Sequence, residues 1–440
     1  MAENAYSSKK VLNKAIFNIG FQIVPIAAAL ILTPYLIETM GKDSWAKYSI
    51  GVSLIFLSNY FSFGIGPTLN RRVSEIIGLK QNHRIKEELK ECVSFSYLLG
   101  TVFFIILQIV LYVAYRSQSF SVLKSTSDYT FFFIVLSVFL MAFILIPYRS
   151  LLESFSDFYF LAIARAVTAA MLFLIPFAYI YFSEISLSGI ATSLFIVYIL
   201  LCFLYFFRIK RYQKKLSFDV YGPFNWNVIQ RVFKFEIGFL KETIWFSIFF
   251  LTSAFVLFFD RFYYPIFFDT NIISDQVTML DLFNRVAIIT GTISLVYFSA
   301  ISVWYQEKNL SRIKSSLRLQ LIGVGGLFTF ILLFSYFFLD DILKWWLQSS
   351  FSAFMFENAY HLLLGALMIN YTILLVRPLQ AIGKIKIVSI CLLCSTLIYL
   401  AIVLFLGVYK AITYHYVAFV IKALLDMIIL VTLSRRNKIL

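Results

Sequence analysis

The sequence predicts an all-α integral membrane protein, with about twelve transmembrane helices in two parallel six-helix repeats around a central cavity. Three observations support this prediction. The chain of 440 residues is 61% hydrophobic and only 14% charged, which leaves too little polar surface to cover a water-soluble fold. Apolar runs of about 20 residues recur along it, the length that an α-helix needs to cross hydrocarbon. Several Lys and Arg residues of the first half also reappear in the second half at a fixed spacing.

The apolar runs define the individual helices, because lipid forces backbone polar groups to hydrogen-bond within each helix. The expected spans of the first half are 16–37, 46–69, 92–114, 129–148, 158–182 and 187–207. Those of the second half are 238–259, 279–302, 317–339, 358–376, 386–408 and 412–433. The first span is too long for a signal peptide and contains Pro25 and Pro34, so we expect it to be a retained helix.

The repeat is visible in basic residues at loops and helix ends. Arg84-Ile85-Lys86 reappears as Arg312-Ile313-Lys314, and Arg149 reappears as Arg377, in both cases 228 residues later. We therefore predict an N-terminal bundle over 1–222 and a C-terminal bundle over 223–440. Each bundle has an even number of spans, so the two should have the same orientation, with a pseudo-axis along the membrane normal. Duplicated bundles of this kind are typical of transporters.

The distribution of positive charge predicts the orientation. If the N-terminus is cytoplasmic, 27 Lys and Arg residues lie in cytoplasmic segments and adjoining helix ends, and 7 lie in outer loops. Lys and Arg resist translocation, so both termini are expected in the cytoplasm. The net charge of +15 thus mostly reflects which segments face the cytoplasm. No segment is long enough for a separate basic domain that would bind nucleic acid.

Ionisable residues inside the spans are the candidate functional residues, because each charge at mid-bilayer costs about 2.5–3.5 kcal/mol unless it faces water or a partner. The basic candidates are Arg165, Lys241, Arg285 and Lys422. Such a ladder of positive charge would suit an anionic headgroup, since phosphate oxygens accept strong hydrogen bonds from Arg and Lys.

Acidic residues offer a second interpretation of the same positions. Asp281 precedes Arg285 by four residues and Asp426 follows Lys422 by four, so each pair can be neutralised along its own helix. Glu242, Asp281 and Asp426 are also the candidates for coupling transport to an ion, and each can equally be a structural counter-ion. Asp260 and Arg261, at the outer end of the seventh span, are expected to form a solvated pair.

Catalytic and metal-binding motifs are missing from the sequence. The three histidines are scattered, and Cys391 and Cys394, although spaced like a redox motif, lie inside a span, where packing is the expected role. There is no phosphate-binding loop, no nucleotide fingerprint and no nucleophile with a matched base. The sequence therefore predicts neither an enzyme nor a protein that needs a cofactor or metal.

Several short motifs resemble a known family. They are NIGFQ at 18–22, LTPYLI at 32–37, GIGP at 64–67, NRR at 70–72 and YRSLLE at 148–153. With the architecture of the whole chain, they resemble the polysaccharide exporters of the MATE-like multidrug/oligosaccharidyl-lipid/polysaccharide exporter superfamily. Within it, the chain resembles the O-antigen flippases of the Wzx type.

The resemblance implies a function. Such flippases move undecaprenyl-pyrophosphate-linked saccharide repeat units from the cytoplasmic to the periplasmic leaflet of the bacterial inner membrane, by alternating access and without a cofactor. Basic residues that line the central cavity contact the pyrophosphate, and the four basic candidates occupy comparable environments here. The implied partners are the lipid-linked oligosaccharide, membrane lipids and other polysaccharide-assembly proteins.

Other membrane proteins fit the sequence less well. A multidrug antiporter of the same fold is expected to carry a buried carboxylate in its first span, which has none before Glu38. A major-facilitator transporter shares the layout of six and six helices but would carry a loop motif that is missing from 70–75. An O-antigen polymerase or ligase would be an enzyme with a large outer loop, and the outer loops predicted here are short.

Overall fold

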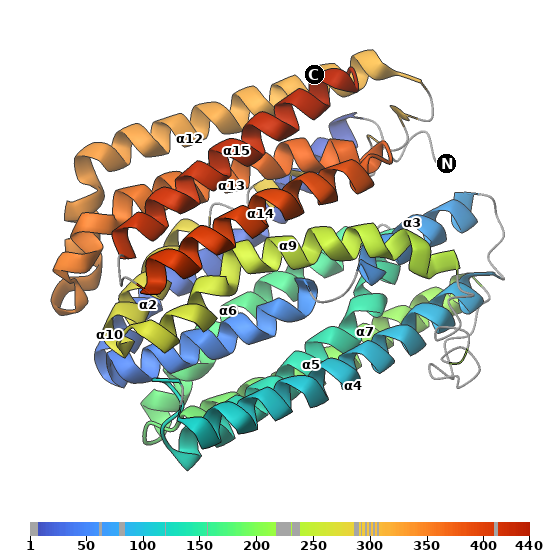
Figure 1. Cartoon of the computed structure of the whole chain (residues 1–440). Coiled ribbons are helices and arrows are strands. Elements are labelled where there is room, and N and C mark those ends of the chain that lie inside the picture. The colour runs from blue at the N-terminus through green and yellow to red at the C-terminus, as the bar shows by residue number, and fades with distance from the viewer. Residues whose placement is uncertain are drawn as a thin grey trace. The chain divides into compact units, whose positions relative to one another are not determined.

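The computed structural model describes residues 8–60, 64–78, 84–118, 120–155, 157–216, 238–285, 308–408 and 412–440, with residue 230 and isolated residues between 290 and 305 (Figure 1). The elements in these ranges are all helices, which confirms the predicted fold class. Among the described residues, nine helices are long and apolar enough to cross a membrane, or ten if the bent pair Thr243–Phe258 and Arg261–Phe267 is one span. The chain is thus a multi-pass membrane protein.

The α-helices in chain order are α2 (Ser8–Tyr60), α3 (Ile65–Gly78), α4 (Ile85–Ser117), α5 (Thr126–Ser154), α6 (Phe158–Phe182), α7 (Leu187–Leu216), α9 (Gly238–Phe267), α10 (Thr270–Phe283), α12 (Leu310–Leu347), α13 (Ala353–Ala381), α14 (Ile385–Val408) and α15 (Ile412–Arg436). A short 3₁₀ helix, η2 (Gln348–Ser350), follows α12.

The helices form two compact units. Unit 1 comprises Met1–Asp43 and Phe267–Leu440, and unit 2 comprises Ser44–Ile266. The chain passes from one unit to the other within α2, just after a kink at Gly41 (φ 76°, ψ 156°), and again at the end of α9. These units are defined by packing, whereas the predicted halves 1–222 and 223–440 are defined by the sequence repeat, and that boundary stays a prediction.

Each unit is built around one helix. In unit 2, α5 packs against α3, α4, α6 and α7, and in unit 1, α13 packs against α10, α12, α14 and α15. The apolar core of unit 2 includes Ile65, Leu69, Phe139, Phe143, Leu161 and Ala254. Burial of these side chains between helices makes each unit compact, while the outward faces remain apolar for contact with lipid, as Phe330, Phe334 and Phe337 on α12 illustrate.

The second predicted span, 46–69, ends earlier than expected. α2 ends at Tyr60 and α3 begins at Ile65, after Gly64 with a positive φ of 66°. A Cβ atom added to Gly64 would lie 2.4 Å from the Cβ of Phe246 on α9. Hydropathy does not register such a break, because the residues on both sides of it are apolar. α3 is therefore a separate helix, with Arg71 and Arg72 in its second turn.

The eighth predicted span, 279–302, also differs from the structure. α10 runs from Thr270 to Phe283, and Asn284 and Arg285 form a turn after it. The span is therefore interrupted near its start and is not one continuous helix. The polar run Ser274-Asp275-Gln276 lies inside α10, so a window average of hydropathy placed the helix too far toward the apolar residues that follow.

Candidate functional site

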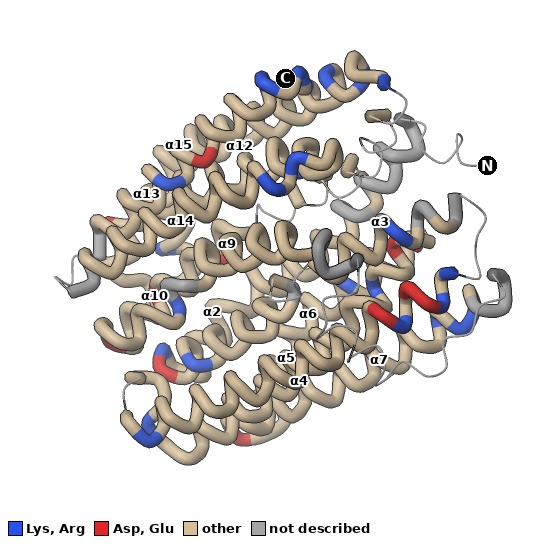
Figure 2. Tube along the Cα trace, turned by 45° about the vertical axis from the view of Figure 1, so that its right-hand side comes forward, with Lys and Arg blue, Asp and Glu red and all other residues tan. Residues whose placement is uncertain are grey.

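Charged residues gather toward the helix ends, and few lie on the central turns (Figure 2). The pair Lys422–Asp426 on α15 is an exception. Its two side chains form an ion pair and are only 5% and 6% exposed. Lys422 lies ten residues from the start of α15, which places it about 15 Å along the helix axis. Since the two residues are four apart, one helix turn brings them together, and the predicted pairing is confirmed.

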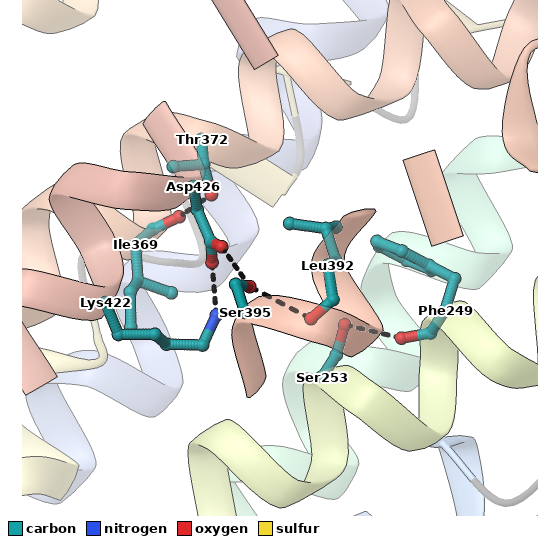
Figure 3. A network of polar contacts seen from close by, with 8 residues as sticks. All are labelled: Phe249, Ser253, Ile369, Thr372, Leu392, Ser395, Lys422 and Asp426. Atoms are coloured by element: carbon teal, nitrogen blue, oxygen red, sulfur yellow. Dashed lines mark hydrogen bonds and ion pairs between the residues drawn. The ribbon is translucent and has the colours of Figure 1, made fainter. Parts of the chain in front are cut away.

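A serine from the neighbouring helix completes this network (Figure 3). The hydroxyl of Ser395 on α14 donates to Oδ1 of Asp426 at 2.5 Å and also lies 3.0 Å from the carbonyl oxygen of Leu392. The Asp426 carboxylate thus receives a hydrogen bond from α14 and an ammonium from α15. These interactions offset part of the cost of removing two charges from water.

Arg165 lies in unit 2, on α6, and pairs with Glu153 near the end of α5. Their side chains are 27% and 11% exposed, so the pair is accessible at one edge. Asn70 of α3 donates from Nδ2 to the second carboxylate oxygen of Glu153 at 3.4 Å. Arg165 is the eighth residue of α6, about 10 Å from its start, which is the depth that the sequence predicted.

Arg149 belongs to the same group, although sequence reasoning used it only as a mark of the repeat and of the family resemblance. It lies one helix turn before Glu153 on α5, and it interacts electrostatically with Arg165 and Glu153. Tyr198 and Tyr205, both buried on α7, interact with Arg149 as well. We call these five residues, Arg149, Glu153, Arg165, Tyr198 and Tyr205, the arginine cluster.

The other predicted site residues are placed as follows. Arg285 and Asp281 are both half-buried, and the backbone N–H of Arg285 donates to the carbonyl of Leu282 at 3.2 Å. Arg285 therefore lies in the turn after α10 and not inside a continuous span. Lys241 and Glu242 fall in the first turns of α9, and their side chains lie outside the described residues.

The proposed ladder of positive charge is divided between the two units. Arg165 and Lys241 belong to unit 2, whereas Arg285 and Lys422 belong to unit 1. The structure brings Arg165 and Lys422 each to a carboxylate of its own unit. Their joint contact with a substrate stays a prediction.

Two buried polar groups were missed or misplaced. In unit 1, Lys42 pairs with Asp275 at 2.8 Å, and Ser352 also donates to that carboxylate. Only the polar run in α10 hinted at this group, because Lys42 and Asp275 are 233 residues apart in the sequence. Arg261, expected in solvent, is 3% exposed and donates to the hydroxyl of Ser53. The position of a charged residue next to an apolar run was therefore not enough to predict that its side chain is exposed to solvent.

The described residues contain no group of three or more His, Cys, Asp or Glu side chains that could bind a metal ion. The polar interactions described above in the spans are those of ion pairs, hydroxyls and amides. These groups can bind and release a polar or charged ligand.

Comparisons with known proteins extend this description. Neither the known family models nor the curated proteins give a match to the sequence. Solved structures do match over nearly the whole chain. An outward-facing multidrug resistance MATE family transporter of the MOP superfamily is 11% identical and has a TM-score of 0.67, covering 98% of this chain and 96% of its own. The chain has the MATE fold.

Two further structures with the MATE fold are informative. The MATE multidrug transporter DinF-BH is 16% identical with a TM-score of 0.64, covering 98% of this chain and 96% of its own. A MOP superfamily transporter from Pyrococcus furiosus is 13% identical with a TM-score of 0.63 and the same coverage, and its reverse pocket polarity is described as suggesting a different function. Proteins with the MATE fold are thus described with pockets of different polarity.

Proposed function

We propose that this protein is a flippase with the MATE fold. It moves undecaprenyl-pyrophosphate-linked O-antigen, or a related polysaccharide repeat unit, from the cytoplasmic to the periplasmic leaflet of a bacterial inner membrane. Both termini face the cytoplasm in this proposal, and the headgroup passes through a cationic central cavity by alternating access. The protein works without a cofactor, and its partners are the lipid-linked oligosaccharide, membrane lipids and other polysaccharide-assembly proteins.

The arginine cluster is the observation that carries this proposal. Arg165 pairs with Glu153, and Arg149 interacts electrostatically with both, so two guanidinium groups gather around this carboxylate one to two turns inside the helix ends. In a medium of low dielectric constant, such a gathering of positive charge favours an anionic ligand over a cationic one. The sequence resemblance points to the same class of cargo, a saccharide attached to lipid through pyrophosphate.

A multidrug antiporter is the second candidate, because two of the similar structures are described as multidrug transporters. Binding of a cationic drug would require an available carboxylate. In unit 1 the carboxylates of Asp275 and Asp426 already have Lys42 and Lys422 as partners. This pairing favours the flippase.

Complementation of cells that assemble O-antigen but lack their own flippase tests the proposal. Wild-type protein should restore polymerised surface glycan when the saccharide is matched. Arg165→Gln, at equal protein level on a blot, should leave lipid-linked oligosaccharide on the cytoplasmic side. Arg318→Gln is the matched control, because it also removes an arginine at a predicted cytoplasmic helix end, but an exposed one.

Two results would count against the flippase. Wild-type protein that exports no glycan in a strain with a matched saccharide would contradict it directly. Raised resistance to cationic drugs in pump-deficient cells, together with absent glycan export, would favour the antiporter instead.

A further inference from the structure

Each compact unit contains one helical segment that the predicted halves of the sequence assign to the other half. The first part of α2, up to Asp43, belongs to the N-terminal half but lies in unit 1, whose other residues follow Ile266. α9 belongs to the C-terminal half but lies in unit 2, apart from its last residue. Relative to the repeat, the two segments are therefore exchanged.

Specific contacts hold the first part of α2 in unit 1. The indole N–H of Trp346 on α12 donates to the carbonyl oxygen of Leu30. The ammonium of Lys42 pairs with Oδ1 of Asp275 on α10 at 2.8 Å, and Oδ2 of this carboxylate accepts from the hydroxyl of Ser352, the N-cap of α13. One carboxylate thus ties the end of this segment to the central helix of unit 1.

A matching set of contacts holds the next residues of α2 in unit 2. Lys47 pairs with Oδ1 of Asp128 at 2.9 Å. Oδ2 of the same carboxylate accepts the backbone N–H of Ser125, the N-cap of α5, at 2.9 Å. Lys42 and Lys47 are only five residues apart, yet each is tied to the N-terminal end of the central helix of a different unit.

α9 is held in unit 2 by apolar and polar contacts. Ala254 belongs to the apolar core of that unit, and the ring of Phe258 lies edge-on to that of Tyr60, with 5.5 Å between the ring centroids. Arg261, which is 3% exposed, donates to the hydroxyl of Ser53. Both exchanged segments are therefore bound to the units in which they lie.

The backbone is interrupted at both points where the chain passes between the units. Gly41 has φ 76° and ψ 156°, a region that is essentially restricted to glycine. A Cβ atom there would meet no other atom, so the backbone conformation, and not close packing, requires the glycine. At the second crossing, Pro265 directly precedes Ile266 and has no N–H to donate within α9. Hinges are built from a few such residues at the ends of elements.

We infer that the two packed units, and not the two halves of the sequence repeat, are the moving bodies of this protein. The first part of α2 moves with unit 1, α9 moves with unit 2, and the hinge points are Gly41 and Pro265. The flexible stem of Lys42 lets the backbone turn while its ammonium stays on Asp275. The inference rests on alternating access, which is part of the proposed function, but not on a particular cargo.

Distances between spin labels on the full-length protein in nanodiscs test the inference. The four cysteines are replaced by alanine, and labels are attached to cysteines that replace the exposed residues Ile31 of α2, Ile398 of α14 and Leu200 of α7. The Ile398–Leu200 distance distribution, measured by double electron–electron resonance, should be broad, because it joins the two units. The Ile31–Leu200 distribution should be equally broad, whereas the Ile31–Ile398 distribution should be narrow.

α9 should give the opposite result. Phe255, which is 45% exposed, is the label position on this helix. Its distance distribution to Leu200 should be narrow and its distribution to Ile398 broad. Reversed widths for Ile31 and Phe255 would show that the sequence halves are the moving bodies, and narrow distributions for every pair would show a single rigid body. Either result would overturn the inference.

Gly41→Ala tests the hinge itself. Alanine cannot adopt the backbone conformation of Gly41 without strain, so the Ile31–Leu200 distribution should shift while the Ile31–Ile398 distribution stays the same. Gly383→Ala is the matched control, because Gly383 also has a positive φ of 81° and open space for a Cβ, but it lies inside unit 1. It should leave the Ile31–Leu200 distribution unchanged. An unchanged Ile31–Leu200 distribution in a folded Gly41→Ala variant would remove the hinge.

The inference stays testable if Gly41→Ala does not fold, since the label pairs in the protein without this substitution already separate units from halves. Its failure is also distinct from that of the proposed function. Glycan export by a protein whose halves move as bodies would retain the flippase and remove the inference. Motion of the units without glycan export in the complementation assay would do the reverse.

Discussion

The two compact units share a helix arrangement and differ in where they place charge. The helices that begin at Ile85, Thr126, Phe158 and Leu187 in unit 2 have counterparts that begin at Leu310, Ala353, Ile385 and Ile412 in unit 1, between 225 and 227 residues later. The central helices α5 and α13 contact corresponding neighbours. Even the N-caps agree, since Ser125 and Ser352 each accept a backbone N–H with the side-chain oxygen.

The charges do not follow this symmetry. Unit 2 has two ion pairs at the end where α5 meets α6, Arg165–Glu153 and Arg208–Asp157, whereas unit 1 has a buried pair halfway along α15. Asp157, the N-cap of α6, corresponds to Lys384, which directly precedes α14. The comparison teaches that apolar packing specifies the fold of each unit, because the same helix arrangement tolerates opposite charges at matching positions. Charge is therefore the better guide to function in this protein.

Breaking the buried pair of unit 1 should have the largest effect. Lys422→Met leaves the carboxylate of Asp426 buried without its ammonium, and removing one partner of a buried pair costs about 3–5 kcal/mol. We expect a large fall in the apparent midpoint of thermal unfolding in detergent. The double variant Lys422→Met/Asp426→Leu should recover much of the loss, because no charge then remains to be desolvated. A double variant as unstable as the single one would show that the pair itself, and not the unpaired charge, determines stability.

Two glycines give a second, smaller contrast between the units. Gly64 of unit 2 and Gly41 of unit 1 both have a positive φ, but only at Gly64 would a Cβ meet another atom, 2.4 Å from Phe246. A side chain at such a positive φ costs about 1–3 kcal/mol, and overpacking adds about 1–3 kcal/mol. Gly64→Ala should therefore lower the thermal midpoint more than Gly41→Ala. The reverse order would mean that the kink in α2, rather than the contact of α3 with α9, limits stability.

The N-cap serines give the smallest expected effect. Ser125→Ala should cost about 1 kcal/mol, and Ser352→Ala should cost more, because Ser352 also donates to the carboxylate of Asp275. The cap of α5 has a second contribution, because Asp128 bonds back to the N-cap backbone and pairs with Lys47 at 2.9 Å. Asp128→Ala should thus destabilise the protein more than Ser125→Ala. Equal thermal midpoints for these two variants would show that the back-bonding and the ion pair of Asp128 contribute little.

The sequence was sufficient for the fold class because lipid imposes helices on long apolar runs. It also identified Lys422–Asp426, since a spacing of four residues is a local property of a helix. It did not predict Lys42–Asp275, which depends on helices far apart in the chain. Arg285 was misplaced because window averages do not detect the turn after α10. In the sequence, Arg149 was visible only as a repeated basic residue. Its neighbours depend on how α5, α6 and α7 pack together, which the sequence did not reveal.

The Arg165–Glu153 pair has a consequence for the return half of a transport cycle. A carrier that releases its cargo on one side must reset without cargo, and moving an uncompensated charge through hydrocarbon would slow this step. In the proposed flippase, the carboxylate of Glu153 would keep Arg165 neutralised during the reset. Arg165 would then need no dissolved counter-anion during this return step.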